Sequence, residues 1–151
     1  MEKGSIDGLE FRMVSAAEIP LVHALWDESG LPFRPEGRDT VERMSAELER
    51  GSAFLPGAFD GGELVGVIMG TSDGRKGWVN RLAVKSSWRG RGLARRLIAL
   101  CEKELERSGL GIICCLIEDW NEASLKLFRS EGYDLRKDIL YLRKTPGGEK
   151  W

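Results

Sequence analysis

The sequence has little of the residue types from which metal centres and nucleophilic hydrolases are built. Its 151 residues include one histidine, His23, and three cysteines. A metal site needs several such ligands at close spacing, and a Ser-His-Asp or Cys-His site would depend on His23 alone. The composition therefore predicts no metal centre, and it makes His23 an ordinary surface or core residue of an expected helix.

The sequence matches a hydrolase motif, but the elements expected around the match are not those that the motif requires. Residues 70–74 spell Gly-Thr-Ser-Asp-Gly, which matches the nucleophile elbow G-x-S-x-G. The elbow needs a helix directly after it and a histidine later in the chain. Here a strand is expected next and His23 comes earlier, so the sequence disfavours a hydrolase.

A strong net charge and long apolar runs are also missing. The formal charge is −1 and the isoelectric point about 6.0, so the whole molecule has no field that would draw it to nucleic acid or to an anionic membrane. No segment approaches the length of a membrane span, and the opening residues MEKGSIDGLEF contain no apolar run typical of a signal peptide. We therefore expect a cytoplasmic protein without a membrane or nucleic-acid partner.

Cysteine is too scarce and too unevenly placed for a disulfide framework. Cys114 and Cys115 are adjacent on an expected strand, where neighbouring side chains point to opposite faces. This placement fits free thiols in a reducing compartment. The apolar setting of both, and of Cys101 on an expected helix, predicts raised thiol pKa values and inert packing residues.

The chain does have the length and composition of one globular domain. With 42% hydrophobic residues it can bury a core of ordinary size, and a second domain has no room. Patterns of period two and 3.6, turn residues and capping signals predict strands at 9–14, 53–59, 64–70, 78–84, 112–117 and 133–142, and helices at 15–29, 40–51, 93–108 and 121–132. This order predicts an α+β domain over residues 1–145, with a mixed sheet flanked by about four helices and a frayed tail at 146–151.

The most informative stretch is a strand, a basic glycine turn and a long amphipathic helix. Between Lys85 and Cys101 there are five basic residues and no acidic one, at the point where the helix begins. Each cation at a helix N-terminus is unfavourable by about 0.3–1 kcal/mol unless an anion is near. A bound phosphate resolves this conflict, and Gly90 and Gly92 would let the backbone approach it closely. The basic residues are Lys85, Arg89, Arg91, Arg95 and Arg96.

The turn does not match the common nucleotide-binding motifs. The dinucleotide fingerprint requires a small residue where Arg95 stands, and no Gly-Lys-Ser/Thr of a P-loop occurs. A nucleic-acid module would need interleaved aromatic residues and a basic overall charge, both of which are missing. An ordinary tight turn with solvated arginines stays open as the alternative.

The stretch resembles a known family. The segment Arg89-Gly90-Arg91-Gly92-Leu93-Ala94, between a strand and a helix, is similar to the Gln/Arg-x-x-Gly-x-Gly/Ala signature of the GNAT superfamily of acyl-CoA-dependent N-acyltransferases. The likeness extends to residues 82–84 and to 121–133, and it is convincing from position 62 onward. It implies the GNAT order of elements and acetyl-CoA as co-substrate, with no metal.

The resemblance also implies which residues hold the cofactor. The backbone of Leu82 and Val84 would bond the pantetheine arm and the thioester carbonyl, and the amides of residues 90–94 would take the pyrophosphate. Asn121 matches an asparagine that reaches the pantetheine, although a plain helix N-cap explains it equally well. The full set is Leu82, Ala83, Val84, Arg89, Gly90, Arg91, Gly92, Leu93, Ala94, Arg95, Asn121 and Phe128.

The proton carriers are less well marked. Many family members have a tyrosine that protonates the leaving thiolate, and Phe128 stands at that position here. For a base, Glu118 would end the strand at 112–117 on the same face as Cys114, and Asn80 would share a face with Leu82 and orient a water. Ordinary roles, a solvated carboxylate and a sheet amide, compete with both assignments.

Acceptor recognition is expected in the part that is least family-like. Trp26, Glu28 and Phe33, with Arg34 beside them, cluster around the proline-rich connection of the first two helices, and a glutamate beside aromatic rings suits a cationic amine. The predicted function is acetyl transfer to a small amine, a peptide N-terminus or a lysine, by direct attack in a ternary complex. The alternative is a catalytically silent acyl-CoA sensor. The resemblance leaves a homodimer open.

Overall fold

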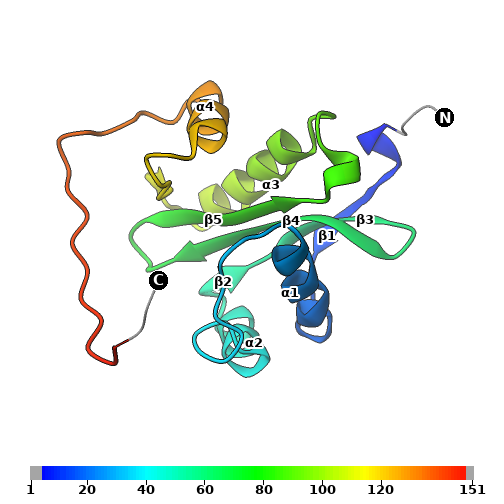
Figure 1. Ribbon diagram of the computed structural model, residues 1–151, viewed down its shortest axis with the longest axis horizontal. Coiled ribbons are helices and arrows are strands. Elements are labelled where there is room, and N and C mark those ends of the chain that lie inside the picture. The colour runs from blue at the N-terminus through cyan, green and yellow to red at the C-terminus, as the bar shows by residue number, and fades with distance from the viewer. Residues whose placement is uncertain (1–4, 149–151) are drawn as a thin grey trace. The chain divides into compact units, whose positions relative to one another are not determined.

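The computed structural model describes residues 5–148 (Figure 1). Within it the chain forms two compact units, Met1–Leu116 and Ile117–Trp151, and each is described by itself. The predicted domain boundary at 145 stays a prediction, and the predicted tail at 146–151 extends past the last described residue. None of the described helices is long and apolar enough to cross a membrane.

The first unit is built on one mixed sheet. Its order is β1-β3-β4-β5-β6, and β2 pairs separately with β4. All neighbouring pairs are antiparallel except β5 and β6, which are parallel as expected for a strand that returns after a helical crossover. The strands are β1 (Glu10–Met13), β2 (Ala53–Phe54), β3 (Pro56–Asp60), β4 (Glu63–Ser72), β5 (Gly77–Val84) and β6 (Ile113–Cys114).

Three of the four α-helices of the described chain begin within one residue of their predicted start, whereas the helix expected from Ser15 opens with a 3₁₀ turn (Ala16–Glu18) and becomes α-helical only at Ile19. The Glu18 carboxylate accepts the Ser15 N–H at 3.0 Å in the expected capping box, and Thr40 Oγ1 accepts the Arg43 N–H at 3.2 Å. Together with the mixed sheet, these helices confirm the predicted α+β class. They are α1 (Ile19–Glu28), α2 (Val41–Arg50), α3 (Leu93–Arg107) and, in the second unit, α4 (Glu122–Ser130).

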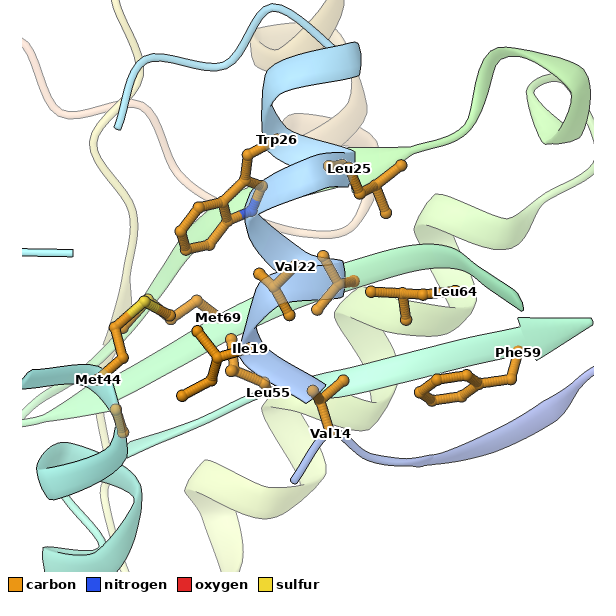
Figure 2. Close-up of a cluster of buried hydrophobic side chains, with 13 residues drawn as sticks. Val14, Ile19, Val22, Leu25, Trp26, Met44, Leu55, Phe59, Leu64 and Met69 are labelled. Atoms are coloured by element: carbon orange, nitrogen blue, oxygen red, sulfur yellow. The ribbon is translucent and has the colours of Figure 1, made fainter. Parts of the chain in front are cut away.

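A hydrophobic core lies between α1, α2 and the sheet. The helix α1 turns Ile19, Val22 and Trp26 inward at helical spacing, and none of the three has exposed surface. Figure 2 shows these side chains over the strands, with Met44 of α2 joining them beside Met69. Burying each such side chain stabilises the fold by about 1.5–3 kcal/mol, so this core fixes α1 on the sheet.

The helix α3 covers the opposite face of the sheet (Figure 1). Its buried stripe recurs at helical spacing, as predicted, and ends at Leu105. Two strand glycines let it lie close, because a Cβ at Gly77 would come within 2.9 Å of Leu105 and one at Gly66 within 3.0 Å of Leu97. This packing fixes the start of α3 beside the end of β5.

Three predicted strands differ from the structure. The one expected at 53–59 is two strands, β2 and β3, interrupted at Leu55. The strand expected at 112–117 is only Ile113–Cys114, and Ile112 and Leu116 are exposed. It is short because β5 pairs with it only at Gly77 and Trp78. The prediction of one or two strands over 133–142 is wrong, since the described chain after Ser130 contains no helix or strand. Alternating apolar residues form a strand only where a partner satisfies their backbone groups, and the local pattern carries no information about one.

Candidate functional site

The strand β5 has an open edge. On one side it pairs with β4 along most of its length, but on the other side β6 pairs only with Gly77 and Trp78. From Val79 to Val84 that second edge has no strand partner among residues 5–116. Unpaired N–H and C=O groups on a strand edge can bond an extended ligand as a further strand would. Leu82, Ala83 and Val84, predicted to hold the pantetheine arm, all lie on this segment.

A bulge interrupts β5 in the same segment. Val67 of β4 faces Ala83 and Met69 faces Asn80, so two residues of β5, Arg81 and Leu82, oppose the single residue between them on β4. Arg81 has a φ of +44°. The bulge breaks the alternation of inward and outward side chains, so the expectation that Asn80 and Leu82 share one face does not follow from strand geometry here.

The open edge leads into the glycine turn at the start of α3. Gly90 and Gly92 have φ values of +74° and +83°, a conformation that favours glycine, and no atom lies within 4 Å of where a Cβ would stand. Gly92 is the N-cap of α3, with no side-chain cap and no acidic residue in the first turn. By contrast, Thr40 caps α2 and Asn121 caps α4. The first amides of α3 are therefore available to an anion.

Two arginines of the turn are held in place by the backbone. Arg89 Nε donates to the Val84 carbonyl at 3.3 Å, and Arg91 Nη2 donates to the Ser87 carbonyl at 2.6 Å. The Arg91 guanidinium also lies 4.4 Å from the centre of the Trp88 ring. These contacts order the two cations around the turn before any ligand arrives, and a diphosphate fits the resulting positive, glycine-lined site.

Lys85 differs from the other basic residues of the cluster. Its ammonium pairs with Glu63 of β4 and lies 4.0 Å from the Glu28 carboxylate. The hydrogen bond to Glu63 raises the pKa of Lys85. Its charge is therefore already balanced, and the sequence could not show this because Glu63 is far from Lys85 along the chain.

The residues predicted to carry protons lie in different units. Asn80 donates from Nδ2 to Thr71 Oγ1 at 3.0 Å across the β4–β5 pair. Glu118, expected at a strand end, instead follows the short β6 as an exposed residue of the second unit, so its predicted position on a strand face is wrong. The catalytic roles of both stay predictions.

In the second unit, Asn121 is the N-cap of a helix, the alternative role that the sequence left open. Its Oδ1 accepts the Ser124 N–H at 3.2 Å and so caps α4. Phe128 is buried and meets the Tyr133 ring edge-on, with ring centres 5.1 Å apart. A cofactor contact by either residue stays a prediction, and Asn121 Oδ1 would have to share its lone pairs to make one.

The residues predicted to meet the acceptor form an aromatic group around the α1–α2 connection. His23, Trp26 and Phe33 lie with ring centres 5.3–5.9 Å apart. Trp26 has no exposed surface, so in this structure it supports the connection from within the core, whereas Phe33 is partly exposed and Glu28 half-exposed. Arg34 binds Asp39 through its backbone N–H at 2.6 Å.

Sequence reasoning missed two residues of this region, Arg81 and Asp39. Asp39 is the one polar or charged residue of the described chain that is buried, at 4% exposure, and Arg81 Nη1 lies 2.5 Å from its Oδ1. A charged residue in the middle of an apolar strand is a signal that could have pointed to Arg81, because a buried cation needs a partner.

Two of the cysteines, Cys101 and Cys115, behave as predicted from their setting. All three are free thiols. Burial raises the pKa of Cys101 to about 12 and that of Cys115 to about 11. Neither is poised as a nucleophile. Among residues 5–148, no group of three or more His, Cys, Asp or Glu side chains could hold a metal ion.

Comparisons with known proteins agree on one family. The model of the Acetyltransferase (GNAT) family matches residues 19–133. The chain is 30% identical over 138 residues to "Acetyltransferase SG1711" of Sodalis glossinidius (strain morsitans), covering 90% of this chain and 94% of that protein. This match spans nearly the whole of both proteins.

Solved structures share the fold at lower identity. The PaiA N-acetyltransferase of Thermoplasma acidophilum in complex with coenzyme A has a TM-score of 0.75 and 17% identity, covering 87% of this chain and 92% of its own. The aminoglycoside N-acetyltransferase AAC(6')-Iy, in complex with the bisubstrate analogue CoA-S-monomethyl-acetylneamine, has the same TM-score of 0.75 and the same identity of 17%. The match covers 91% of this chain and 98% of that one. At such identities the similarity is one of fold.

Proposed function

The chain belongs to the Acetyltransferase (GNAT) family, and we propose that it transfers an acetyl group from acetyl-CoA to a primary amine. Family membership makes it an acyltransferase. A small amine, a peptide N-terminus and a lysine side chain are all acceptors of the right chemistry. We favour a small-molecule amine, because one structure with this fold is an aminoglycoside N-acetyltransferase bound to an analogue that joins coenzyme A to such an amine.

The observation that carries this proposal is the continuity of the open β5 edge with the uncapped start of α3. The edge at Leu82 and Val84 offers backbone groups to the amides of a pantetheine arm. The turn at Gly90 and Gly92 then offers the backbone N–H groups at the start of α3, with ordered arginines, to a pyrophosphate. An extended, amide-containing chain that ends in a diphosphate is the ligand that fits both in sequence.

The protein has to do little more for this reaction than hold the amine and the thioester in position. The amine nitrogen attacks the thioester carbonyl carbon in a ternary complex, the C–N bond forms, and the C–S bond breaks as the thiolate leaves. A backbone N–H near Leu82 would stabilise the oxyanion, and the amine loses its proton to Glu118 or to a water held by Asn80. Phe128 cannot protonate the thiolate. Because a thiol has a pKa of about 8–9, it can leave without that help.

The test has two steps. We expect isothermal titration to show one acetyl-CoA bound per chain, and we expect a thiol reagent to detect free coenzyme A when an amine from a panel is added. The panel should include aminoglycosides, polyamines and peptides with a free N-terminus. A chain that binds no acetyl-CoA would contradict the proposal at its first step.

Phe128 favours a second candidate, a catalytically silent acyl-CoA sensor. Both functions require cofactor binding, but only an enzyme releases thiol in proportion to acetylated amine. Binding without release across the whole panel would favour the sensor. A Phe128→Tyr variant sharpens the choice, because restoring the family residue should raise turnover only if the remaining machinery is intact.

A further inference from the structure

The bulge of β5 contains the one strained residue of the described backbone. Arg81 is the only residue other than glycine between 5 and 148 with a positive φ, at +44°. An L-amino acid with a long side chain disfavours this conformation, and such a residue persists only where its surroundings impose it. The surroundings of Arg81 therefore need an explanation.

The side chain of Arg81 is held from two other elements. Its Nη1 bonds Asp39 Oδ1 at 2.5 Å, and its guanidinium lies 4.9 Å from the centre of the Trp26 ring of α1. The side chains are 14% and 5% exposed for Arg81 and Asp39, so the pair is shielded from water. Removing one partner of a shielded ion pair is costly because it leaves the other charge in a poorly solvated place, where Asp39 would be left with Arg38 Nε as a charged neighbour, at 3.8 Å from its Oδ2.

Asp39 is in turn fixed within the α1–α2 connection. Its Oδ2 accepts the Arg34 N–H at 2.6 Å, and its own N–H donates to the Arg34 carbonyl at 2.8 Å. It directly precedes Thr40, the N-cap of α2. The connection of the first two helices is thus tied through one carboxylate to the extra residue of β5.

From this arrangement we propose that Arg81 and Asp39 form a positioning pair for acyl transfer. The pair holds residue 81 in its left-handed conformation, and that conformation sets the direction of the Leu82 backbone on the open edge. This inference rests on the proposed function, in which the same backbone meets the thioester. The pair also links the acceptor side, where Phe33 and Glu28 lie, to the strand that holds the acyl group.

The test compares two substitutions that remove the same ion pair. Arg81→Ala loses the pair and keeps a side chain that disfavours positive φ, whereas Arg81→Gly loses the pair but adopts that φ freely. We expect kcat with the best amine to fall about tenfold or more in Arg81→Ala, since small misplacements of reacting groups have effects of that order. Arg81→Gly should recover to within about threefold of the parent, because the backbone returns to its course.

Coenzyme A affinity and a matched variant separate positioning from general damage. The diphosphate turn is distinct from the bulge, so coenzyme A affinity should fall by no more than about threefold in Arg81→Ala, less than kcat falls, even where the contact between Leu82 and the pantetheine arm weakens. Arg12→Ala is the control: Arg12 bonds Glu18 at 2.7 Å and lies 3.8 Å from the Phe59 ring centre, an ion pair with a ring contact like that of Arg81 but more exposed and away from the bulge. It should leave kcat unchanged even if the melting temperature falls.

Each outcome bears on the proposal. Equal kcat values for Arg81→Gly and Arg81→Ala would overturn it, as would an equal loss in Arg12→Ala. If Arg81→Ala does not fold, Arg81→Asn replaces it, and its kcat should lie below that of Arg81→Gly because asparagine tolerates positive φ less well than glycine.

A failure of the proposed function would look different. If the parent protein binds acetyl-CoA but releases no thiol with any amine of the panel, the readout becomes the ratio of acetyl-CoA to coenzyme A affinity, which depends on the thioester contact. That ratio should change in Arg81→Ala and return in Arg81→Gly, and an unchanged ratio in both would overturn the inference.

Discussion

Gly92 is the residue at which backbone conformation and anion chemistry coincide. It caps α3 at a φ of +83° and faces open space. We expect Gly92→Asp to lower coenzyme A affinity by about 100-fold or more, because a carboxylate a few ångströms from a phosphate repels it by several kcal/mol where water is partly excluded. Isothermal titration measures the loss.

The chain offers a close control for that substitution. Gly109, just after the other end of α3, has a φ of +80° and the same open surroundings. Gly109→Asp therefore costs similar backbone strain without placing charge at the turn. If both variants lose affinity equally, strain rather than repulsion is the cause, and the anion site lies elsewhere.

The cysteines give a second prediction at the level of single residues. Since burial raises the pKa of Cys101 to about 12 and that of Cys115 to about 11, both stay protonated near neutral pH. At pH 8 only about one thiol in a thousand or fewer would be thiolate, so alkylation of these two by iodoacetamide in the folded protein should be slow and rise about tenfold per pH unit. Peptide mass mapping follows each site, and urea-unfolded protein should react at all three cysteines. Rapid labelling of either residue in the native state would contradict the burial.

Single residues also show where sequence reasoning stops. The glycines and arginines of the turn could be found because their roles depend on neighbours in the chain. The pairing of Lys85 with Glu63, and of Arg81 with Asp39, depends on the fold bringing distant segments together. A strand pattern assumes regular alternation, so it could not reveal the bulge that Arg81 occupies.

At the scale of elements, the close packing of α3 on the sheet depends on a strand glycine, Gly77, that has no side chain. A Cβ at Gly77 would lie 2.9 Å from two methyl carbons of the fully buried Leu105. Gly77→Ala should therefore destabilise the protein by about 1–3 kcal/mol through overpacking. Chemical denaturation checks the value, and Gly111→Ala is the control, because no atom lies within 4 Å of its Cβ position and its φ is not in the left-handed region. If Gly77→Ala left the free energy of unfolding unchanged, α3 would be able to move away from the strand without destabilising the protein.

The start of α1 carries a pH-dependent contribution. The Arg12 guanidinium, and then the Ser15 N–H, hold the pKa of Glu18 at about 2, below its ordinary 4.5. A carboxylate with a lowered native pKa stabilises the fold above its unfolded pKa, and that stability is lost as the pH falls toward the native value. The urea midpoint of the parent should therefore fall toward that of Glu18→Gln between about pH 4.5 and pH 2. A difference that persists unchanged at the acid end would contradict this role of Glu18.

Elements whose signals are local were predicted well. Thr40 caps the start of α2, the Ser15 capping box begins the 3₁₀ turn that leads into α1, and the turn at Gly61 and Gly62 joins the β3–β4 hairpin. The expected strand over 133–142 fails for the opposite reason, because a strand exists only with a partner and the partner is not encoded nearby. The candidate site follows the same division: its turn could be predicted, whereas its open edge and bulge required the sheet.

At the scale of the whole molecule, charge separates an acyl carrier site from a nucleic-acid surface. The chain has a net charge of −1, so its cations act locally at the turn of α3 rather than as a broad basic face. We expect coenzyme A affinity to fall only a few-fold between about 50 and 500 mM salt, because a site with two ordered arginines and backbone amides is partly shielded. A short DNA duplex should neither bind at low salt nor displace coenzyme A. Competition by the duplex, with affinity that falls steeply as salt rises, would instead place phosphate-backbone binding at these arginines.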